Sequence, residues 1–306
     1  MKEKILITGA SGFLGKILSY ELTNIGYDLL TIGRKKTDTI YADLTDDNLH
    51  LPIEHSNIDI VIHSAGKAHS IPRTEQEAKV FLDVNFEGTK NLCRAIDLQK
   101  KLPKAFIFIS SVAVYGVDKG QLIPESHQLN GSTPYAQSKI LAEEWLQTWA
   151  KENGVILSIL RLPLVAGYHP PGNLGAMIKG ISSGRYASIG KANARKSMVW
   201  APDIAYIVPK LAIKGGVYNL TDDYHPTFGE LEYGISSLLG KKEPIRIPMN
   251  FAKGIAILGD ILGNKSPINS EKLKKITSTL TFDDTKAKKL LDWRPNKVLD
   301  KLSQII

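Results

Sequence analysis

The sequence predicts an α/β protein with a doubly wound parallel sheet, and two patterns in its first 165 residues carry this prediction. Short apolar runs rich in Ile, Val, Leu and Phe alternate with longer helical patterns. Several of these runs lack the polar alternation of a half-exposed strand, as expected where helices cover both faces of a parallel sheet. The repeated strand–helix–strand order implies right-handed crossovers between neighbouring strands.

The elements follow in order along the chain. Strands are expected at 4–8, 27–33, 39–44, 58–64, 105–111 and 156–162. Apolar residues in 13–26 recur at helical spacing and end at Gly26, which predicts the first helix. A longer helical pattern, 73–101, precedes the fifth strand.

The alternation of strand and helix patterns ends after residue 165, where a Pro- and Gly-rich segment occupies 166–175. Helices are expected beyond it, at 175–184, 202–216, 229–240 and in the charged C-terminal region, while the run 216–221 can return to the main sheet. We therefore expect a sheet domain over 1–165, joined by the returning segment 201–223. A smaller, mostly helical domain takes 166–200 and 224–306, at the sheet edge where open α/β sheets bind ligands.

Charge and composition narrow the classes of function. The net charge is +8, and residues 241–306 hold 14 Lys and Arg against 7 Asp and Glu. Solvated helix faces explain this excess best, since no basic strand with interleaved aromatics suggests a nucleic-acid partner; an anionic small substrate is a further possibility. The only cysteine, Cys93, excludes an internal disulfide. No apolar run approaches the roughly 20 residues that span a bilayer, so we expect a cytoplasmic protein with no membrane partner.

A glycine-rich turn marks the first strand–helix junction. The stretch "LITGASGFLG" places Gly9, Gly12 and Gly15 between the first strand and the first helix. Glycines there permit a tight turn and close approach to a pyrophosphate, which the helix start then holds through its free amides. This pattern predicts dinucleotide binding and hence a Rossmann domain, with Ser11, Phe13 and Leu14 beside the glycines.

The end of the second strand bears on the choice of cofactor. An acidic residue there would accept a hydrogen bond from the ribose 2′-hydroxyl of NAD, but the sequence reads "TIGRKKTD". Arg34 and Lys35 suit a 2′-phosphate instead. We therefore expect NADP(H) to be preferred and NAD(H) to be possible, although Arg34 can also be a surface cation. Asp43, followed by Leu44, can face the adenine or cap the next segment.

The spacing Tyr-x-x-x-Lys occurs three times, and its context separates the three. Gly116 and Gly120 break the segment of Tyr115, and Pro209 falls within that of Tyr206. Tyr135 instead follows a helix start, with Ser132 or Thr133 as the N-cap and Pro134 in the first turn. Lys139 then lies on the same helix face as Tyr135.

This pairing has a chemical use. A nearby ammonium lowers the pKa of a phenol, which can then exchange a proton with a sugar hydroxyl while hydride leaves the same carbon. Ser110 and Ser111 end the fifth strand and supply a hydroxyl for the substrate oxygen, or a backbone cap.

Together these segments resemble the extended short-chain dehydrogenase/reductases, specifically their nucleotide-sugar epimerase/dehydratase group. The resemblance covers nearly the whole chain and is carried by "TGASGFLG", "ADLTD", "VIHSAG", "VNFEGTKNL", "SSVAVYG", "YAQSK", "RLPLVAG", "KSMVWAPDIA" and "FDDTKAKKLLDWRP". It implies a catalytic set of Ser111, Tyr135 and Lys139, with Lys139 also at the nicotinamide ribose. It further implies a homodimer and a cofactor pocket lined by Ala65, Gly66, Asn85, Leu162 and Pro163.

Departures from the group's patterns bear on the reaction. Sugar dehydratases carry an acid and a base after the serine, where this chain has Val112 and Ala113, so we expect no dehydration. Typical 4-epimerases carry Asn at the position that matches Leu164, which favours reduction of a 4-keto nucleotide sugar and leaves 4-epimerisation with retained NAD as the alternative. A non-catalytic nucleotide sensor is disfavoured because Tyr135 and Lys139 are both present. Arg195 or Lys196 can bind the substrate diphosphate, or both can be surface charges; no metal is expected.

Overall fold

The fold is built around one seven-stranded parallel sheet. The computed structural model describes residues 2–52, 57–68, 70, 72–262 and 269–306. The strand order is β11-β7-β5-β4-β1-β2-β3, and each neighbouring pair is parallel. The strands are β1 Lys4–Thr8, β2 Asp28–Gly33, β3 Ile40–Tyr41, β4 Ile60–His63, β5 Ala105–Ser111, β7 Ile156–Leu162 and β11 Gly216–Asn219. This arrangement confirms the predicted doubly wound α/β fold.

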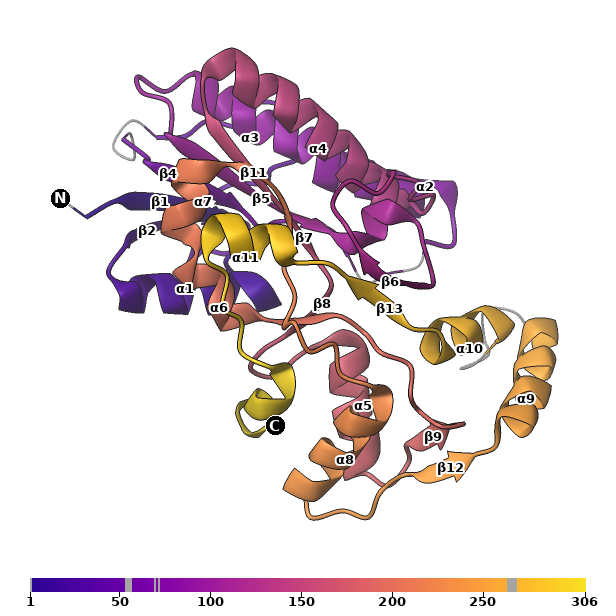
Figure 1. Cartoon of the computed structure of the whole chain (residues 1–306). Coiled ribbons are helices and arrows are strands. Elements are labelled where there is room, and N and C mark those ends of the chain that lie inside the picture. Colours follow the sequence, from indigo (N-terminus) through magenta and orange to yellow (C-terminus); the bar gives the residue numbers. More distant parts are fainter. Residues whose placement is uncertain (1, 53–56, 69, 71, 263–268) are drawn as a thin grey trace.

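Helices cover both faces of this sheet (Figure 1). One face carries α3 (Gly88–Asp97) and α4 (Pro134–Asn153), preceded by α2 (Glu75–Leu82) and a π-helical turn at Asp83–Glu87. The other face carries α1 (Phe13–Ile25), α6 (Ala201–Tyr206), α7 (Val208–Lys214) and α11 (Thr285–Leu291). The apolar runs without alternation are therefore buried from two sides, as their sequence predicts.

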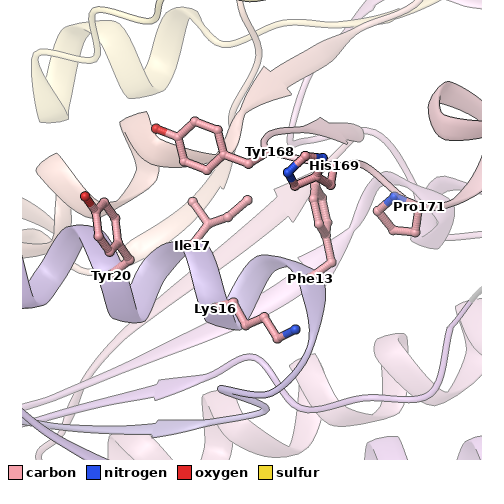
Figure 2. Close-up of a pocket in the computed structure, with 7 residues that line it drawn as sticks. All are labelled: Phe13, Lys16, Ile17, Tyr20, Tyr168, His169 and Pro171. Carbon is pink, nitrogen blue, oxygen red and sulfur yellow. The ribbon is translucent and has the colours of Figure 1, made fainter. Parts of the chain in front are cut away.

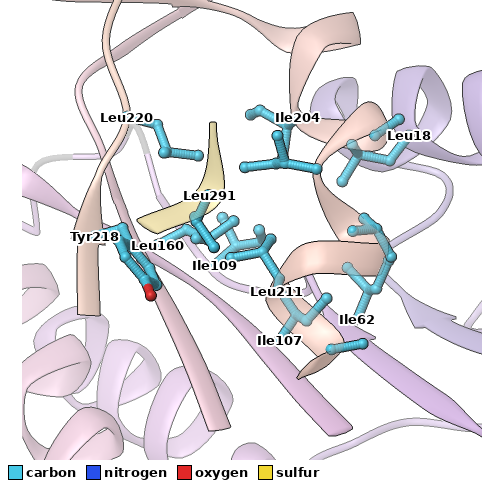
Figure 3. Close-up of a cluster of buried hydrophobic side chains, with 14 of the residues drawn as sticks. Leu18, Ile62, Ile107, Ile109, Leu160, Ile204, Leu211, Tyr218, Leu220 and Leu291 are labelled. Atoms are coloured by element: carbon cyan, nitrogen blue, oxygen red, sulfur yellow. The ribbon is translucent and has the colours of Figure 1, made fainter. Parts of the chain in front are cut away.

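The core on the second face joins distant parts of the chain. Figure 3 shows Leu18 of α1, Ile204 of α6, Leu211 of α7 and Leu291 of α11 converging on strand residues such as Ile107. The predicted return of 216–221 to the sheet is observed as β11, which pairs with β7. Helix α11 also packs here, although its residues fall in the segment predicted to form the smaller domain.

The remaining elements form a smaller lobe beside the carboxyl edge of the sheet (Figure 1). Its helices are α5 Gly172–Ser182, α8 Phe228–Leu238, α9 Met249–Leu262, α10 Ser270–Thr277 and α12 Leu302–Ile305, with a 3-10 turn at Val298–Lys301. Three short parallel pairs brace it and its junction with the sheet: β8 Leu164–Ala166 with β10 Met198–Trp200, β9 Ala187–Ile189 with β12 Ile245–Ile247, and β6 Gly120–Ile123 with β13 Leu280–Phe282. In the part of the chain that is described, no helix is both long and apolar enough to cross a membrane.

Candidate active site

The glycine turn after β1 is closely packed. Gly9 adopts a φ of +70°, a left-handed conformation that favours glycine, and its carbonyl accepts a hydrogen bond of 2.9 Å from the Gly12 amide. A Cβ at Gly15 would lie 2.1 Å from the Gly9 oxygen. Helix α1 therefore presses its first turn onto the loop, which leaves its leading amides directed at the carboxyl edge of the sheet. Ser11 is exposed at the tip of this turn, while Phe13 and Leu14 are half-buried at the helix start.

A second turn, after β4, touches the first. The Ala65 amide donates to Thr8 Oγ1 at 2.9 Å, and a Cβ at Gly9 would lie 2.7 Å from Ala65 Cα. A Cβ at the next residue, Gly66, would lie 3.4 Å from Lys139 Nζ. The structure thus brings the predicted cofactor loop and the predicted catalytic lysine to one place.

Asn85 holds this second turn against α4. Its buried amide accepts from the Lys67 amide at 2.6 Å and donates to the Lys67 carbonyl at 3.0 Å and to Ser138 Oγ at 2.9 Å. The π-helical turn between α2 and α3 directs Asn85 inward. Because these bonds occupy its amide, Asn85 fixes the backbone at Lys67 and so the shape of the second turn.

The predicted catalytic residues lie on two adjacent elements. Ser111 is the last residue of β5, opposite Leu162 at the end of β7. Tyr135 lies in the first turn of α4, which starts as predicted: Thr133 Oγ1 accepts from the Ala136 amide at 3.1 Å, and Pro134 is the first helical residue. Lys139 follows one turn later, with its Nζ donating to the Ile109 carbonyl at 2.8 Å.

The electrostatics of the pair differ from the sequence prediction. Burial raises the pKa of Tyr135, and a hydrogen bond with Ser111 offsets this only in part. Burial also lowers the pKa of Lys139 to about 8, against the opposing effect of the Glu143 carboxylate. The phenol pKa therefore moves in the direction opposite to the prediction, because desolvation of the phenol outweighs the interactions that favour its anion. Tyr135 is consequently a protonated hydroxyl at neutral pH.

A buried ion pair behind Lys139 escaped the sequence analysis. Arg161 of β7 donates to the Glu143 carboxylate through Nη2 at 2.7 Å and Nε at 3.1 Å, and Ser110 donates to the same carboxylate. Arg161 also donates to the Tyr115 hydroxyl at 3.2 Å. The sequence does indicate the place of Glu143, because it follows Lys139 by four residues and therefore shares its helix face.

The other two tyrosines have no comparable setting. Tyr115 is fully buried, and its hydroxyl donates to Asn219 Oδ1 at 2.7 Å. Tyr206 is exposed on α6, and its companion Lys210 pairs with Asp292. Tyr115 is therefore a core residue and Tyr206 a surface residue.

The residues predicted to select the cofactor lie together at the surface. Arg34 follows β2, and its Nη1 lies 3.7 Å from Asp43 Oδ2. Asp43 also accepts hydrogen bonds from the amide and hydroxyl of Thr45. Of the two roles expected for Asp43, these bonds correspond to capping of the next segment. Leu44 is buried and its carbonyl accepts from Asn91. The Arg34 guanidinium remains largely exposed and can reach an added anion.

The predicted diphosphate ligands are engaged with backbone. Arg195 Nη1 donates to the carbonyls of Tyr224 at 3.3 Å and His225 at 2.9 Å. Lys196 Nζ donates to the Lys275 carbonyl at 2.9 Å. Either cation would have to exchange a partner to bind a diphosphate. Pro163, half-buried, links β7 to β8 between the sheet and this lobe.

The larger of the two described cavities adjoins the glycine turn without including Ser111, Tyr135 or Lys139. It measures about 610 Å³ and is lined by Phe13, Lys16, Ile17, Tyr20, Tyr168, His169 and Pro171. Figure 2 shows Phe13, Ile17 and Tyr20 of α1 on the side of the segment that follows β8, whereas Lys16 points away from it. Because Phe13 is the first residue of α1, this cavity lies along the helix and beside the turn.

A family model described as the NAD dependent epimerase/dehydratase family matches residues 5–220. The chain belongs to this family. A similar curated protein is N-acetyl-alpha-D-glucosaminyl-diphospho-ditrans,octacis-undecaprenol 4-epimerase of Escherichia coli O157:H7, 28% identical, with 94% of this chain and 89% of that protein covered. UDP-glucose 4-epimerase of Vibrio cholerae is 28% identical over 98% and 93%.

A solved structure confirms the fold. UDP-glucose 4-epimerase of Thermotoga maritima with UDP-glucose has a TM-score of 0.75 and 21% identity, covering 98% of this chain and 96% of that one. The resemblance found in the motifs is thus confirmed at the level of the family.

Proposed function

We propose that the chain catalyses hydride exchange at C4 of a nucleoside-diphosphate sugar, with a nicotinamide dinucleotide as its cofactor. The proposal is supported above all by the arrangement of Tyr135, Ser111 and Lys139 beside the glycine turn. Tyr135 bonds with Ser111, and Lys139 lies under Gly66.

The residues present fit a dinucleotide. The turn at Gly9 and the first turn of α1 offer amides to a diphosphate, as helix starts do in this fold. Gly66 leaves room where a Cβ would meet both Asn85 Oδ1 at 3.1 Å and Lys139 Nζ at 3.4 Å. Once bound, the nicotinamide would accept and return the hydride of the sugar carbon.

The chain's own groups then manage the proton and the substrate oxygen. In reduction, the Tyr135 hydroxyl donates its proton to the C4 carbonyl oxygen as that oxygen becomes a hydroxyl. Oxidation, the first half of an epimerisation, requires the Tyr135 phenolate, which takes the proton of the C4 hydroxyl. Ser111 holds the same oxygen. The Lys139 ammonium adds positive charge that favours the phenolate left behind.

Two reactions share this chemistry. The names of both curated relatives favour 4-epimerisation, in which the carbon is oxidised and then reduced on its opposite face. Arg34 at the end of β2 and Leu164 in β8 favour reduction of a 4-keto sugar with an exchangeable NADP(H). The observations that favour 4-epimerisation are at least as many as those that favour reduction, so both reactions are proposed here.

The bound cofactor separates the two reactions. Pure protein is denatured and its released nucleotide identified by chromatography. Stoichiometric NAD would support epimerisation and contradict an exchangeable reductant. Cofactor-free protein stabilised by NADPH more than by NADH in scanning fluorimetry would support the reductase.

The role of Tyr135 is tested by substitution. Fluorimetry against a panel of nucleoside-diphosphate sugars first selects a substrate; the panel includes a sugar carried on a diphospho-polyprenol, as the E. coli relative's name suggests. Tyr135→Phe should then lower kcat by about 100-fold or more. Tyr206→Phe, which alters an exposed tyrosine with the same spacing to a lysine, should leave kcat unchanged. Unimpaired turnover by Tyr135→Phe would refute this site.

We also propose a cytoplasmic homodimer that pairs α2, α3 and α4 with the same helices of a second copy, as the resemblance implies. Sedimentation velocity should give twice the monomer mass. A monomer at micromolar concentration would contradict it.

A further inference from the structure

Helix α9 has its large and small apolar residues on unexpected sides. Phe251, Leu258 and Ile261 are 65%, 62% and 78% exposed, whereas Ala252 and Ala256 are buried against α10. Core-facing helices ordinarily bury their large apolar residues, because the transfer of apolar surface out of water is favourable. The outer face of α9 is therefore an apolar surface without a partner in the described chain.

The exposed residues make a continuous stripe. Phe251, Ile255 and Leu258 are spaced at i, i+4 and i+7, so they share one side of the helix, with Ile257 and Ile261 beside them. At 14 residues, α9 is about 21 Å long and too short to cross the roughly 30 Å hydrocarbon core of a bilayer. A stripe of this length suits a helix that lies along an interface.

Positive charge exceeds negative charge in the segments that adjoin this stripe. Lys253 on α9, Lys274 on α10 and the pair Lys241 and Lys242 before β12 are exposed. Residues 241–277 contain eight Lys and Arg and three Asp and Glu. Apolar side chains flanked by lysines match an anionic lipid surface. Two copies meeting face to face here would bring like charges together, which disfavours self-association through α9.

The helix is placed to make such a contact. Figure 1 shows α9 at the outer edge of the smaller lobe, between β12 and α10 and away from the sheet. Met249 at the start of α9 and Ile276 and Thr277 at the end of α10 also line the second described cavity, of about 140 Å³. Because Met249 shares the helix face of the buried Ala252 and Ala256, this cavity lies on the inner side of α9, away from the stripe.

We propose that α9 docks on an anionic membrane surface, with its Phe251, Ile255, Leu258 and Ile261 side chains in the headgroup boundary and the neighbouring lysines on lipid phosphates. The sequence alone gave no membrane partner because its apolar runs are too short to span a bilayer. The exposure of this face is a property of the folded chain. The proposal is independent of the reaction proposed above.

The test is co-sedimentation of the full-length protein with vesicles. Phosphatidylcholine vesicles containing about one-third phosphatidylglycerol should bind the protein, less so as salt increases, and pure phosphatidylcholine vesicles should bind it weakly. Leu258→Glu and Ile261→Glu should each lower the partition coefficient by about tenfold or more, and Lys253→Glu combined with Lys274→Glu should weaken binding at low salt. Ile213→Glu, at an exposed position of α7, is the matched control and should not change it.

Near-ultraviolet circular dichroism and the melting temperature of each variant show that it is folded. The proposal is overturned if the wild-type protein stays in the supernatant with anionic vesicles, or if Ile213→Glu weakens binding as much as Leu258→Glu. It is also overturned if Leu258→Glu only converts a dimer to a monomer in sedimentation velocity, since α9 would then be a contact between copies.

Discussion

His63 is a buried titratable side chain that the proposed reaction does not use. It ends β4, with Nδ1 at 2.7 Å from Thr8 Oγ1 and Nε2 at 2.9 Å from Thr89 Oγ1. Burial, reinforced by the Lys139 ammonium, lowers the pKa of His63 to about 3. The folded protein therefore holds a neutral imidazole between two hydroxyls.

This residue predicts acid sensitivity. Below pH ~6.5 the unfolded chain binds a proton that the folded chain excludes until about pH 3, so the stabilisation is complete above pH ~6.5 and declines as the pH falls through that window. His63 should account for about 2 kcal/mol of lost unfolding free energy between pH 7.5 and pH 5. Urea unfolding at both pH values measures it. His63→Gln should remove that part of the pH dependence, and His50→Gln, at an exposed histidine, is the control. An equal pH dependence in wild type and His63→Gln would refute the assignment.

Arg34 carries the prediction on cofactor choice. If its exposed guanidinium binds a 2′-phosphate, Arg34→Ala should weaken NADP(H) by about tenfold or more and leave NAD(H) nearly unchanged. Isothermal titration with both cofactors measures this, and Lys36→Ala is the control for general loss of charge. Equal weakening of both cofactors would instead place Arg34 outside the 2′-phosphate site.

For single residues, the sequence predicts which side chains share a helix face or a turn, but it does not predict how deeply each side chain is buried or which groups surround it. Helical spacing alone brings Tyr135 and Lys139 to one face, and Gly9 sits at the turn that requires its conformation. The direction of the Tyr135 pKa shift could not be predicted, because it depends on burial and on the hydrogen bond with Ser111. Those are tertiary contacts with β5, which no local pattern contains.

Among the elements, α4 and β7 are joined by the Arg161–Glu143 pair, which has almost no exposure. Removing one member of a buried pair leaves an uncompensated charge, so Arg161→Met should lower the free energy of unfolding by about 3–5 kcal/mol. The double variant with Glu143→Gln should recover part of the loss, since neither charge remains. Urea unfolding at neutral pH measures both.

An exposed ion pair supplies the control for this experiment. Lys275 pairs with Glu271 on the surface of α10, and Lys275→Met should change stability by no more than about 1 kcal/mol. If Arg161→Met lowers the free energy of unfolding no more than Lys275→Met does, the buried pair does not hold α4 on the sheet.

Helices and strands with a clear local pattern of apolar residues could be predicted from the sequence. Strands that form only by pairing with residues far along the chain could not. The runs 4–8, 105–111 and 156–162 have the bounds of β1, β5 and β7, and the first helix ends at Gly26 as predicted. The run 39–44 contributes only the two residues of β3. The pair β6 and β13 joins residues about 160 positions apart along the chain, and the outward stripe of α9 appears only once α10 covers its other side.

Across the whole molecule, the chain returns twice to its N-terminal sheet. Segment 201–223 supplies α6, α7 and β11, and α11 adds Ala287 and Leu291 to the same core. Trp293, just after α11, is buried there and donates through Nε1 to the Thr221 carbonyl at 2.9 Å. The sheet half is therefore completed by residues near the C-terminus.

This closure predicts that the end of the chain stabilises its beginning. Leu291 is fully buried in the sheet core, whereas its neighbour Leu290 is half-exposed on the same helix. Leu291→Ala should lower the free energy of unfolding by about 2–5 kcal/mol, while Leu290→Ala should change it by no more than about 0.5 kcal/mol. Urea unfolding followed by circular dichroism and by tryptophan fluorescence measures both variants. Similar midpoints for the two, or a sheet signal that persists after the α11 region unfolds, would mean that the N-terminal half is stable without its C-terminal helix.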